Sequence, residues 1–173
     1  MYLFILGAGK SALDSQPAAL AEVKSSMKAL DWLLSSFKPS IEVNNIYFLG
    51  GFRIADINQS YPSLKTLFIP DWERTKVIDT FFQIPWPNGR TVVCYSDTIF
   101  TEKLIKELCE RDEDVVACAD SDWKQRYENR SKSDIDSAEK IVFNRVECEF
   151  TGLACFSKKA IGKILALQKC RLP

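Results

Sequence analysis

A short glycine-containing stretch near the N-terminus could hold a phosphate group. Directly after the apolar residues 2–6, the chain reads Gly7, Ala8, Gly9 and Lys10. Glycines let a phosphate approach backbone N–H groups closely, and a lysine adds positive charge. The stretch has neither the full Walker pattern nor the third glycine of a dinucleotide fingerprint. Two interpretations therefore stay open, a phosphate-binding loop and a tight turn at the end of a strand.

A single carboxylate, Asp97, lies just after the apolar stretch 91–95, in Tyr95-Ser96-Asp97. Open α/β sheets bind their ligands at the carboxyl ends of the strands. Mg²⁺ prefers oxygen ligands and is commonly held by one or two carboxylates together with substrate phosphates. Asp97 is therefore a candidate Mg²⁺ ligand. Alternatively, it caps the loop before a helix that begins near Thr101.

The segment 120–130, DSDWKQRYENR, combines aromatic and basic residues. Trp123 and Tyr127 are four residues apart, so a helix would place them on one face. The same segment carries the cations Lys124, Arg126 and Arg130. Aromatic rings beside guanidinium groups suit a phosphate or a quaternary amine. A solvated helix with two half-buried aromatic side chains would explain the same pattern.

The elements that must position these residues alternate between strands and helices. Strands are predicted at 2–6, 45–49, 65–69, 91–95, 114–119, 140–143 and 149–156. The first five are nearly continuous apolar runs, typical of buried central strands in a parallel sheet. Apolar residues at helical spacing predict helices at 25–37, 101–111 and 157–167, with Thr101 and Ser157 as caps. We expect a single α/β domain over residues 1–173 with a doubly wound, mixed, mostly parallel, Rossmann-like sheet.

The composition excludes several classes of partner and site. Lys plus Arg and Asp plus Glu both number 23, so the net charge is zero and no global field favours nucleic acid. The chain has no His and no CxxC pair, which removes the usual zinc sites and the Ser-His and Cys-His pairs. The N-terminal apolar run 2–6 is too short for a signal peptide or a membrane span. We expect a cytoplasmic protein without a membrane partner. Buried free thiols are expected at Cys94, Cys118, Cys148 and Cys155.

The order and spacing of these stretches resemble those in the nucleotidyltransferases with an A-type glycosyltransferase-like fold. Nucleoside-diphospho-sugar transferases have the same fold. The chain is most similar to the branch of cytidylyltransferases that act on phosphocholine or 2-aminoethylphosphonate. The matching stretches are residues 6–10 (LGAGK), 46–52 (IYFLGGF), 69–76 (IPDWERTK), 95–97 (YSD), 120–130 and 138–140 (AEK). The block 120–130 followed by 138–140 is the most specific match. The resemblance covers roughly residues 1–168.

The resemblance implies an activity and a set of site residues. A phosphate or phosphonate oxygen of a small acceptor attacks the α-phosphorus of a nucleoside triphosphate, favoured to be CTP, and pyrophosphate leaves. Asp97 would bind the cofactor Mg²⁺ and, with Lys10, serve catalysis. The implied nucleotide-binding residues are Leu6, Gly7, Ala8, Gly9, Lys10, Gly50, Thr75 and Ser96. The implied acceptor-binding residues are Trp123, Arg126, Tyr127, Arg130, Glu139 and Lys140.

The sequence departs from the family pattern at several phosphate-contacting positions. The second glycine and the arginine of the loop are replaced within residues 11–13, the family's lysine is Ala18, and its asparagine is Lys76. The chain also ends at Pro173, before the region that carries a second carboxylate in the family. Three expectations remain open: an active cytidylyltransferase, a degenerate member that binds nucleotide or a partner protein without turnover, or a domain that a second chain completes, as a homodimer or with a partner.

Overall fold

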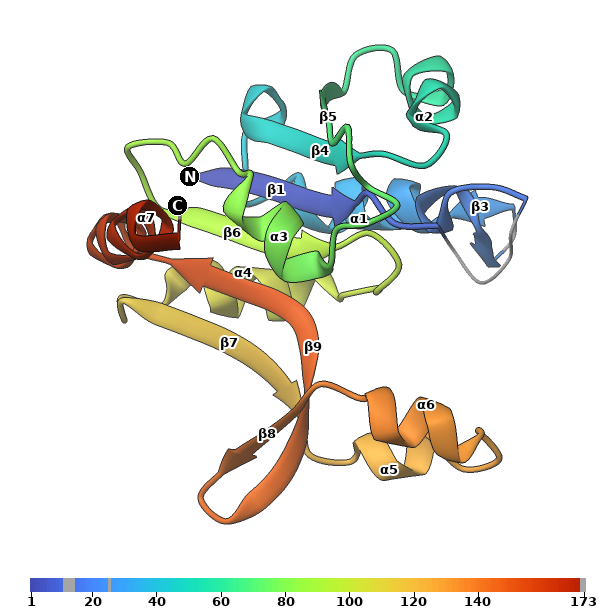
Figure 1. The fold of residues 1–173 in the computed structure, drawn as a ribbon, viewed down its shortest axis with the longest axis vertical. Helices are drawn as coiled ribbons and strands as arrows, with labels where there is room; N and C mark the ends of the chain where they lie inside the picture. Colours follow the sequence, from blue (N-terminus) through green and yellow to red (C-terminus); the bar gives the residue numbers. More distant parts are fainter. Residues whose placement is uncertain (11–14, 25, 172–173) are drawn as a thin grey trace.

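The computed structural model describes residues 1–10, 15–24 and 26–171. Some of the predictions above depend on residues outside this part, namely residues 11–13, Ser25 and Pro173. The centre of the molecule is a seven-stranded sheet (Figure 1). Its strands, in spatial order, are β5 (Lys65–Phe68), β4 (Ile46–Gly50), β1 (Tyr2–Gly7), β6 (Thr91–Tyr95), β9 (Val146–Phe156) and β7 (Val115–Asp120), and β8 (Lys140–Phe143) also pairs with β9.

The first four strands in this order pair in parallel, and β9 is antiparallel to β6, β7 and β8. Only β9 therefore runs against the common direction, and the predicted α/β fold with a mixed, mostly parallel sheet is confirmed. The register brings the carboxyl ends of the central strands together. Gly7 pairs with Gly50, Leu6 pairs with Tyr95, and Ser96 N donates to the carbonyl oxygen of Leu6 over 3.0 Å. The loops after β1 and β6 therefore meet at one edge of the sheet.

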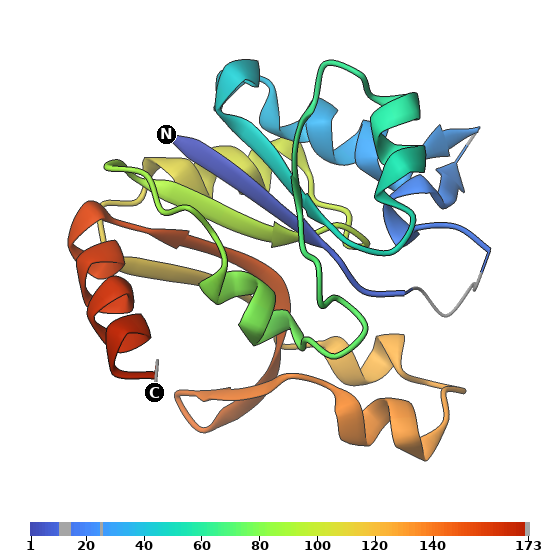
Figure 2. The ribbon, with the colours of Figure 1, turned by 45° about the horizontal axis from the view of Figure 1, so that its top comes forward.

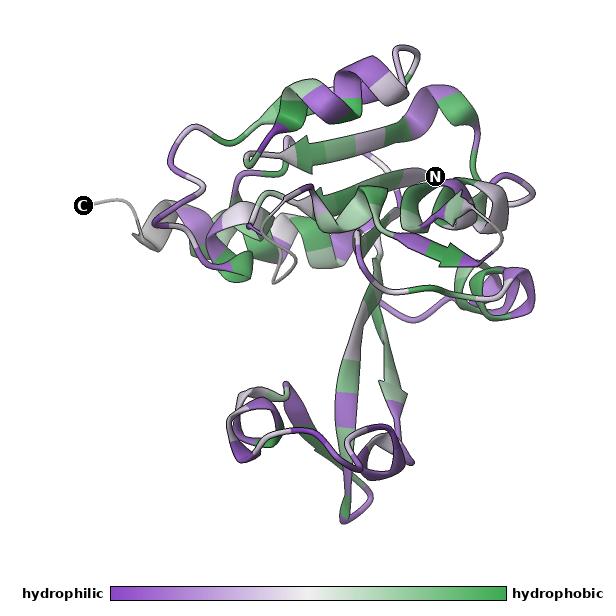
Figure 3. Ribbon diagram, turned by 90° about the vertical axis from the view of Figure 1, so that its right-hand side faces the viewer, coloured by the Kyte–Doolittle hydropathy of each residue, from purple (hydrophilic) through white to green (hydrophobic). Residues whose placement is uncertain are grey.

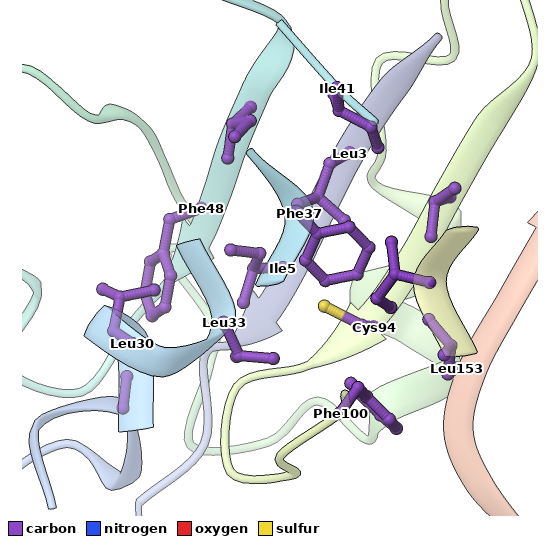
Figure 4. Packing of buried hydrophobic residues seen from close by; sticks show 14 of the residues in the cluster. Leu3, Ile5, Leu30, Leu33, Phe37, Ile41, Phe48, Cys94, Phe100 and Leu153 are labelled. Carbon is purple, nitrogen blue, oxygen red and sulfur yellow. The ribbon is translucent and has the colours of Figure 1, made fainter. Parts of the chain in front are cut away.

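Helices cover both faces of the sheet. On one face, α1 (Ala29–Phe37), α2 (Ile54–Ser60) and α4 (Glu102–Glu110) supply side chains to a buried cluster with β1, β4 and β6. Figure 4 shows Leu30, Leu33 and Phe37 of α1 packed against Ile5 and Phe48. On the opposite face lie α3 (Val77–Phe82) and α7 (Lys158–Arg171). A hydrogen bond joins these two helices, because the Gln168 side-chain amide of α7 donates to the Phe82 carbonyl oxygen of α3 over 2.6 Å. The remaining elements before β4 are η1 (Ala18–Leu20), β2 (Glu22–Lys24), β3 (Met27–Lys28) and η2 (Val43–Asn45).

An arm stands away from this body (Figure 3). It consists of α5 (Trp123–Arg126), α6 (Lys132–Ser137), β8 and the first part of β9, and Asn144 and Arg145 form the hairpin turn with positive φ. β9 is long enough to pair with β8 in the arm and with β6 and β7 in the body. The arm is thus joined to the body through one continuous strand.

The structure confirms some local predictions and corrects others. Thr101 Oγ1 accepts from Leu104 N over 3.3 Å, and Ser157 Oγ accepts from Ala160 N over 3.1 Å, so both predicted caps form. β5 and β7 are edge strands with exposed side chains and are not the buried central strands that were predicted. The first long helix begins at Ala29, because Met27 and Lys28 pair with β2.

Further findings concern the thiols and the length of the helices. Cys94, Cys148 and Cys155 are buried and unbridged, as expected, and Cys118 is half-buried. None of the helices in the described part of the chain combines the length and the apolar character that a membrane crossing requires.

Candidate functional site

A cavity of about 190 Å³, here named the loop cavity, lies at the carboxyl ends of β1 and β6. Its wall comes from the loop after β1, the turn after β6 and the residues that lead into α3. It is lined by most of the residues predicted to bind nucleotide or metal: Leu6, Gly7, Ala8, Gly9, Lys10, Thr75, Ser96 and Asp97. Residues that are far apart in the sequence therefore meet where an α/β sheet places its ligand.

Gly50 is the predicted nucleotide-binding residue that does not line the loop cavity. It is buried at the end of β4, where a Cβ atom would lie 2.9 Å from Cγ1 of Ile54. At Gly51, a Cβ atom would lie 2.2 Å from Cβ of Trp72 and 2.8 Å from the carbonyl oxygen of Ala8. Phe52 N donates to that same oxygen over 2.9 Å. The two glycines therefore serve packing beneath the loop after β1.

Among the residues that the structure describes, the loop cavity carries two cations and one carboxylate. Lys10, Lys76 and Asp97 line it and are exposed. Lys76 departs from the family pattern in sequence, yet its position adds positive charge to the wall that Ala18 leaves uncharged. No group of three or more His, Cys, Asp or Glu side chains suited to a metal occurs in the described residues. Within the described lining, Asp97 is a carboxylate of the kind that could hold Mg²⁺ together with the oxygens of a bound phosphate.

A second and larger cleft of about 1130 Å³, the wide cleft, extends from α4 to the arm and shares Tyr95 and Asp97 with the loop cavity. Four predicted acceptor-binding residues line it: Arg126, Tyr127, Arg130 and Glu139. Trp123 and Lys140 do not. Trp123 is only 1% exposed, whereas the sequence suggested a half-buried ring, and Lys140 Nζ lies 5.7 Å from the centre of that ring. Trp123 therefore packs inside the arm, and the exposed Lys140 lies over its ring.

A buried carboxylate organises the basic side of the wide cleft. Glu149 is 8% exposed and accepts from Arg126 Nη2 over 2.7 Å and from the Tyr127 hydroxyl. Arg126 Nε also donates to Asp120 Oδ2 over 2.6 Å. The hydrogen bond to Glu149 raises the pKa of Tyr127 above its ordinary value. Arg126 is therefore engaged by two carboxylates, which helps to fix β7 and β9 to α5.

Arg130 has a different environment from Arg126. Its guanidinium lies 4.7 Å from the centre of the Tyr127 ring, a cation–π contact. Within the part of the chain that the structure describes, it forms no ion pair. Of the two predicted arginines, Arg130 is thus the one whose charge is available to an anion in the wide cleft.

Tyr95 lies where the loop cavity, the wide cleft and an apolar pocket beside α3 adjoin, because it lines all three. Its hydroxyl donates to the Glu139 carboxylate, with oxygen distances of 2.8 and 3.0 Å. Burial and this hydrogen bond raise the pKa of Tyr95 well above its ordinary value. Its ring lies on Gly152, where φ is +76° and a Cβ atom would lie 2.2 Å from Cδ2. Tyr95, Gly152 and Glu149 were not among the predicted site residues, although a glycine within a strand pattern signals a close approach of another group to the backbone.

The chain matches solved structures of nucleotidyltransferases along almost its whole length. The inositol-1-phosphate CTP transferase of T. maritima is 14% identical with a TM-score of 0.61, over 91% of this chain and 71% of that chain. The CTP:phosphocholine cytidylyltransferase of Streptococcus pneumoniae is 14% identical with a TM-score of 0.63, over 97% and 75%. The chain has the nucleotidyltransferase fold.

A third structure with this fold is the 4-diphosphocytidyl-2C-methyl-D-erythritol synthase of Anaerococcus prevotii. It is 16% identical with a TM-score of 0.57, over 99% of this chain and 76% of that chain. No protein-family profile and no curated protein matches the sequence. At these identities the shared property is the nucleotidyltransferase fold, and the acting residues have to be argued from the site itself.

Proposed function

We propose that the protein is a Mg²⁺-dependent nucleotidyltransferase that transfers CMP from CTP to a small phospho- or phosphono-compound. The observation that carries this proposal is the loop cavity, which joins a glycine-containing loop, two lysines and one carboxylate at the carboxyl edge of the sheet. Backbone N–H groups and lysines recognise phosphate, and a carboxylate recognises the metal that accompanies it. The fold is the one in which the CTP-dependent enzymes named above perform their reactions.

In the proposed reaction, an acceptor oxygen forms a bond to the α-phosphorus while the bond from this phosphorus to the bridging oxygen of pyrophosphate breaks. The protein contributes position and charge and forms no covalent bond to the substrate. The loop Gly7–Lys10 would hold the triphosphate, with Lys10 and Lys76 beside its negative charge. Asp97 would hold Mg²⁺, which supplies further charge neutralisation when bound. Arg130 would bind the phosphate of the acceptor from the wide cleft.

A second function, nucleotide binding without turnover, is favoured by two observations. Ala18 lines the loop cavity without offering charge. Arg126 is already paired with Asp120 and Glu149. Both reduce the positive charge available to stabilise the transition state, where neutralisation contributes most. Ligand binding alone would not separate the two functions, whereas pyrophosphate release would.

A thermal-shift screen tests the nucleotide site. With Mg²⁺, we expect CTP to raise the unfolding temperature more than ATP, GTP or UTP. A ligand that binds only the folded state adds about 2.7 kcal/mol at a hundredfold excess over its dissociation constant. Lys76→Ala should reduce the shift. Arg74→Ala is the matched control, because Arg74 is exposed two residues away and does not line the loop cavity. Equal shifts in both variants would remove Lys76 from the site, and no shift with any nucleotide would refute the proposal.

A further inference from the structure

An apolar pocket of about 310 Å³ is lined by residues of α3 and of the strands β1, β6 and β9. Figure 2 shows α3 (green) next to β9 (orange-red). Its wall includes Val77, Ile78 and Phe81 from α3 and Phe150, Ala154 and Phe156 from β9. The side-chain polar groups of its lining belong to Tyr95 and Glu139, which are hydrogen-bonded to each other. The volume is at the lower end of the range for small-molecule pockets, which begins at about 300 Å³.

The apolar pocket adjoins the loop cavity. Leu6, Val77 and Tyr95 line both, so the two hollows lie side by side and share part of their wall. The two hollows differ in charge among the described residues, since the loop cavity has Lys10 and Lys76 against the single carboxylate of Asp97, whereas the charged group of the apolar pocket is the carboxylate of Glu139. A phosphate is therefore favoured in the loop cavity and repelled from the apolar pocket.

Two side chains of the pocket wall leave apolar surface in contact with water. Val77 and Ile78 are 46% and 47% exposed, although both belong to a helix that packs on the sheet. An apolar group in the pocket would remove part of this surface from water, which favours its binding. A sugar ring would instead place several hydroxyls against apolar side chains without hydrogen-bond partners, which costs affinity.

We infer that the apolar pocket binds the organic part of the acceptor, and that the acceptor is a phospho- or phosphono-compound with a compact group poor in hydrogen-bonding atoms, such as a short alkyl chain. This inference rests on the proposed function, because it places the acceptor phosphate beside the triphosphate, where the loop cavity meets the wide cleft that carries Arg130. It deepens that function by selecting against sugar phosphates as acceptors.

Calorimetric titration of the full chain with three probes tests the inference: methyl phosphate, n-butyl phosphate and glucose 1-phosphate. Each buried methylene should tighten binding about fourfold. Butyl phosphate should therefore bind at least about tenfold, and at full burial about sixtyfold, more tightly than methyl phosphate. Glucose 1-phosphate should bind no more tightly than methyl phosphate. Equal affinities for the methyl and butyl esters, or tighter binding of the sugar phosphate, would overturn the inference.

Ile78→Gln should reduce the preference for the butyl ester severalfold. Ile141→Gln is the matched control, because Ile141 is 37% exposed, lies on β8 and does not line the pocket. An equal effect of both substitutions, or no effect of Ile78→Gln, would contradict the assignment.

CTP is titrated into the same samples. Intact CTP binding without discrimination between the esters rejects the apolar pocket alone, whereas absent CTP binding overturns the proposed function and this inference with it.

Discussion

At the scale of single residues, Gly7 at the end of β1 and Gly9 in the following loop differ in whether packing requires a glycine. A Cβ atom on Gly7 would lie 2.4 Å from Cζ of Phe48 and 2.8 Å from Oγ of Ser96. A Cβ atom on Gly9 would meet nothing within 4 Å, and Gly9 does not have a positive φ. Packing explains the glycine at position 7 and leaves the one at position 9 unexplained. Close approach of a ligand to the backbone would explain Gly9.

The substitution Gly9→Ala separates packing from ligand binding. The free energy of unfolding should stay unchanged or rise by about 0.4–1 kcal/mol, because alanine restricts the unfolded chain. The affinity for CTP with Mg²⁺ should fall about tenfold, equivalent to about 1.4 kcal/mol, because the new methyl group occupies space beside the phosphates. Denaturant unfolding and calorimetry measure the two quantities. Unchanged affinity would leave Gly9 without a role in nucleotide binding.

The two arginines of the wide cleft should respond differently to removal. Arg126→Ala leaves the buried Glu149 without its cation, so stability should fall by about 1–3 kcal/mol. Arg130→Ala should leave stability unchanged and weaken binding of the phospho-acceptor about tenfold, because its guanidinium has no anionic partner in the described residues. Unfolding curves and acceptor titrations test both. If Arg126→Ala kept its stability and lost acceptor affinity, Arg126 would belong to the acceptor site as the sequence predicted.

At the scale of elements, β9 has to accommodate the Tyr95 ring of β6. Gly152→Ala should destabilise the protein by about 1–3 kcal/mol, because φ is +76° and the new Cβ would lie 2.2 Å from the ring. Gly162→Ala is the control with the opposite expectation. Gly162 lies inside α7 with open space around its Cβ position, so alanine should stabilise by about 0.5–1 kcal/mol. Equal changes in the two unfolding midpoints would argue against this role of Gly152.

The strands show what an apolar pattern can and cannot predict. Each predicted strand exists, because apolar runs between turn residues are a local signal. The position of a strand in the sheet is not local. β7 has an apolar sequence but lies at the edge, because β9 inserts between it and β6. β5 also has an apolar sequence that is typical of a central strand, and it lies at the opposite edge of the sheet. The late start of the first helix has a similar cause, because Met27 and Lys28 pair with β2 and the helix begins only at Ala29.

At the scale of the whole molecule, the topology explains why much of the candidate site could be predicted. Parallel strands end at one edge, so residues that follow apolar runs, such as Lys10 and Asp97, were expected to meet and do so. Packing between distant segments could not be foreseen. The buried Trp123 donates its indole N–H to the Glu147 carbonyl of β9 over 3.3 Å, and the central position of Tyr95 depends on Gly152 of the same strand. Whether these residues bind nucleotide and acceptor remains a prediction.

Pyrophosphate release by the isolated chain tests the central proposal most directly. The assay uses CTP, Mg²⁺ and a panel of acceptors that includes phosphocholine, 2-aminoethylphosphonate and butyl phosphate, with Asp97→Asn as a folded control. Each missing charge-assisted contact is worth roughly 1.5–3 kcal/mol, so two could slow the reaction about a hundredfold or more. We predict slow release that requires CTP, Mg²⁺ and an acceptor and that Asp97→Asn abolishes. No release with any acceptor, or unchanged release by folded Asp97→Asn, would contradict the proposed function of this site.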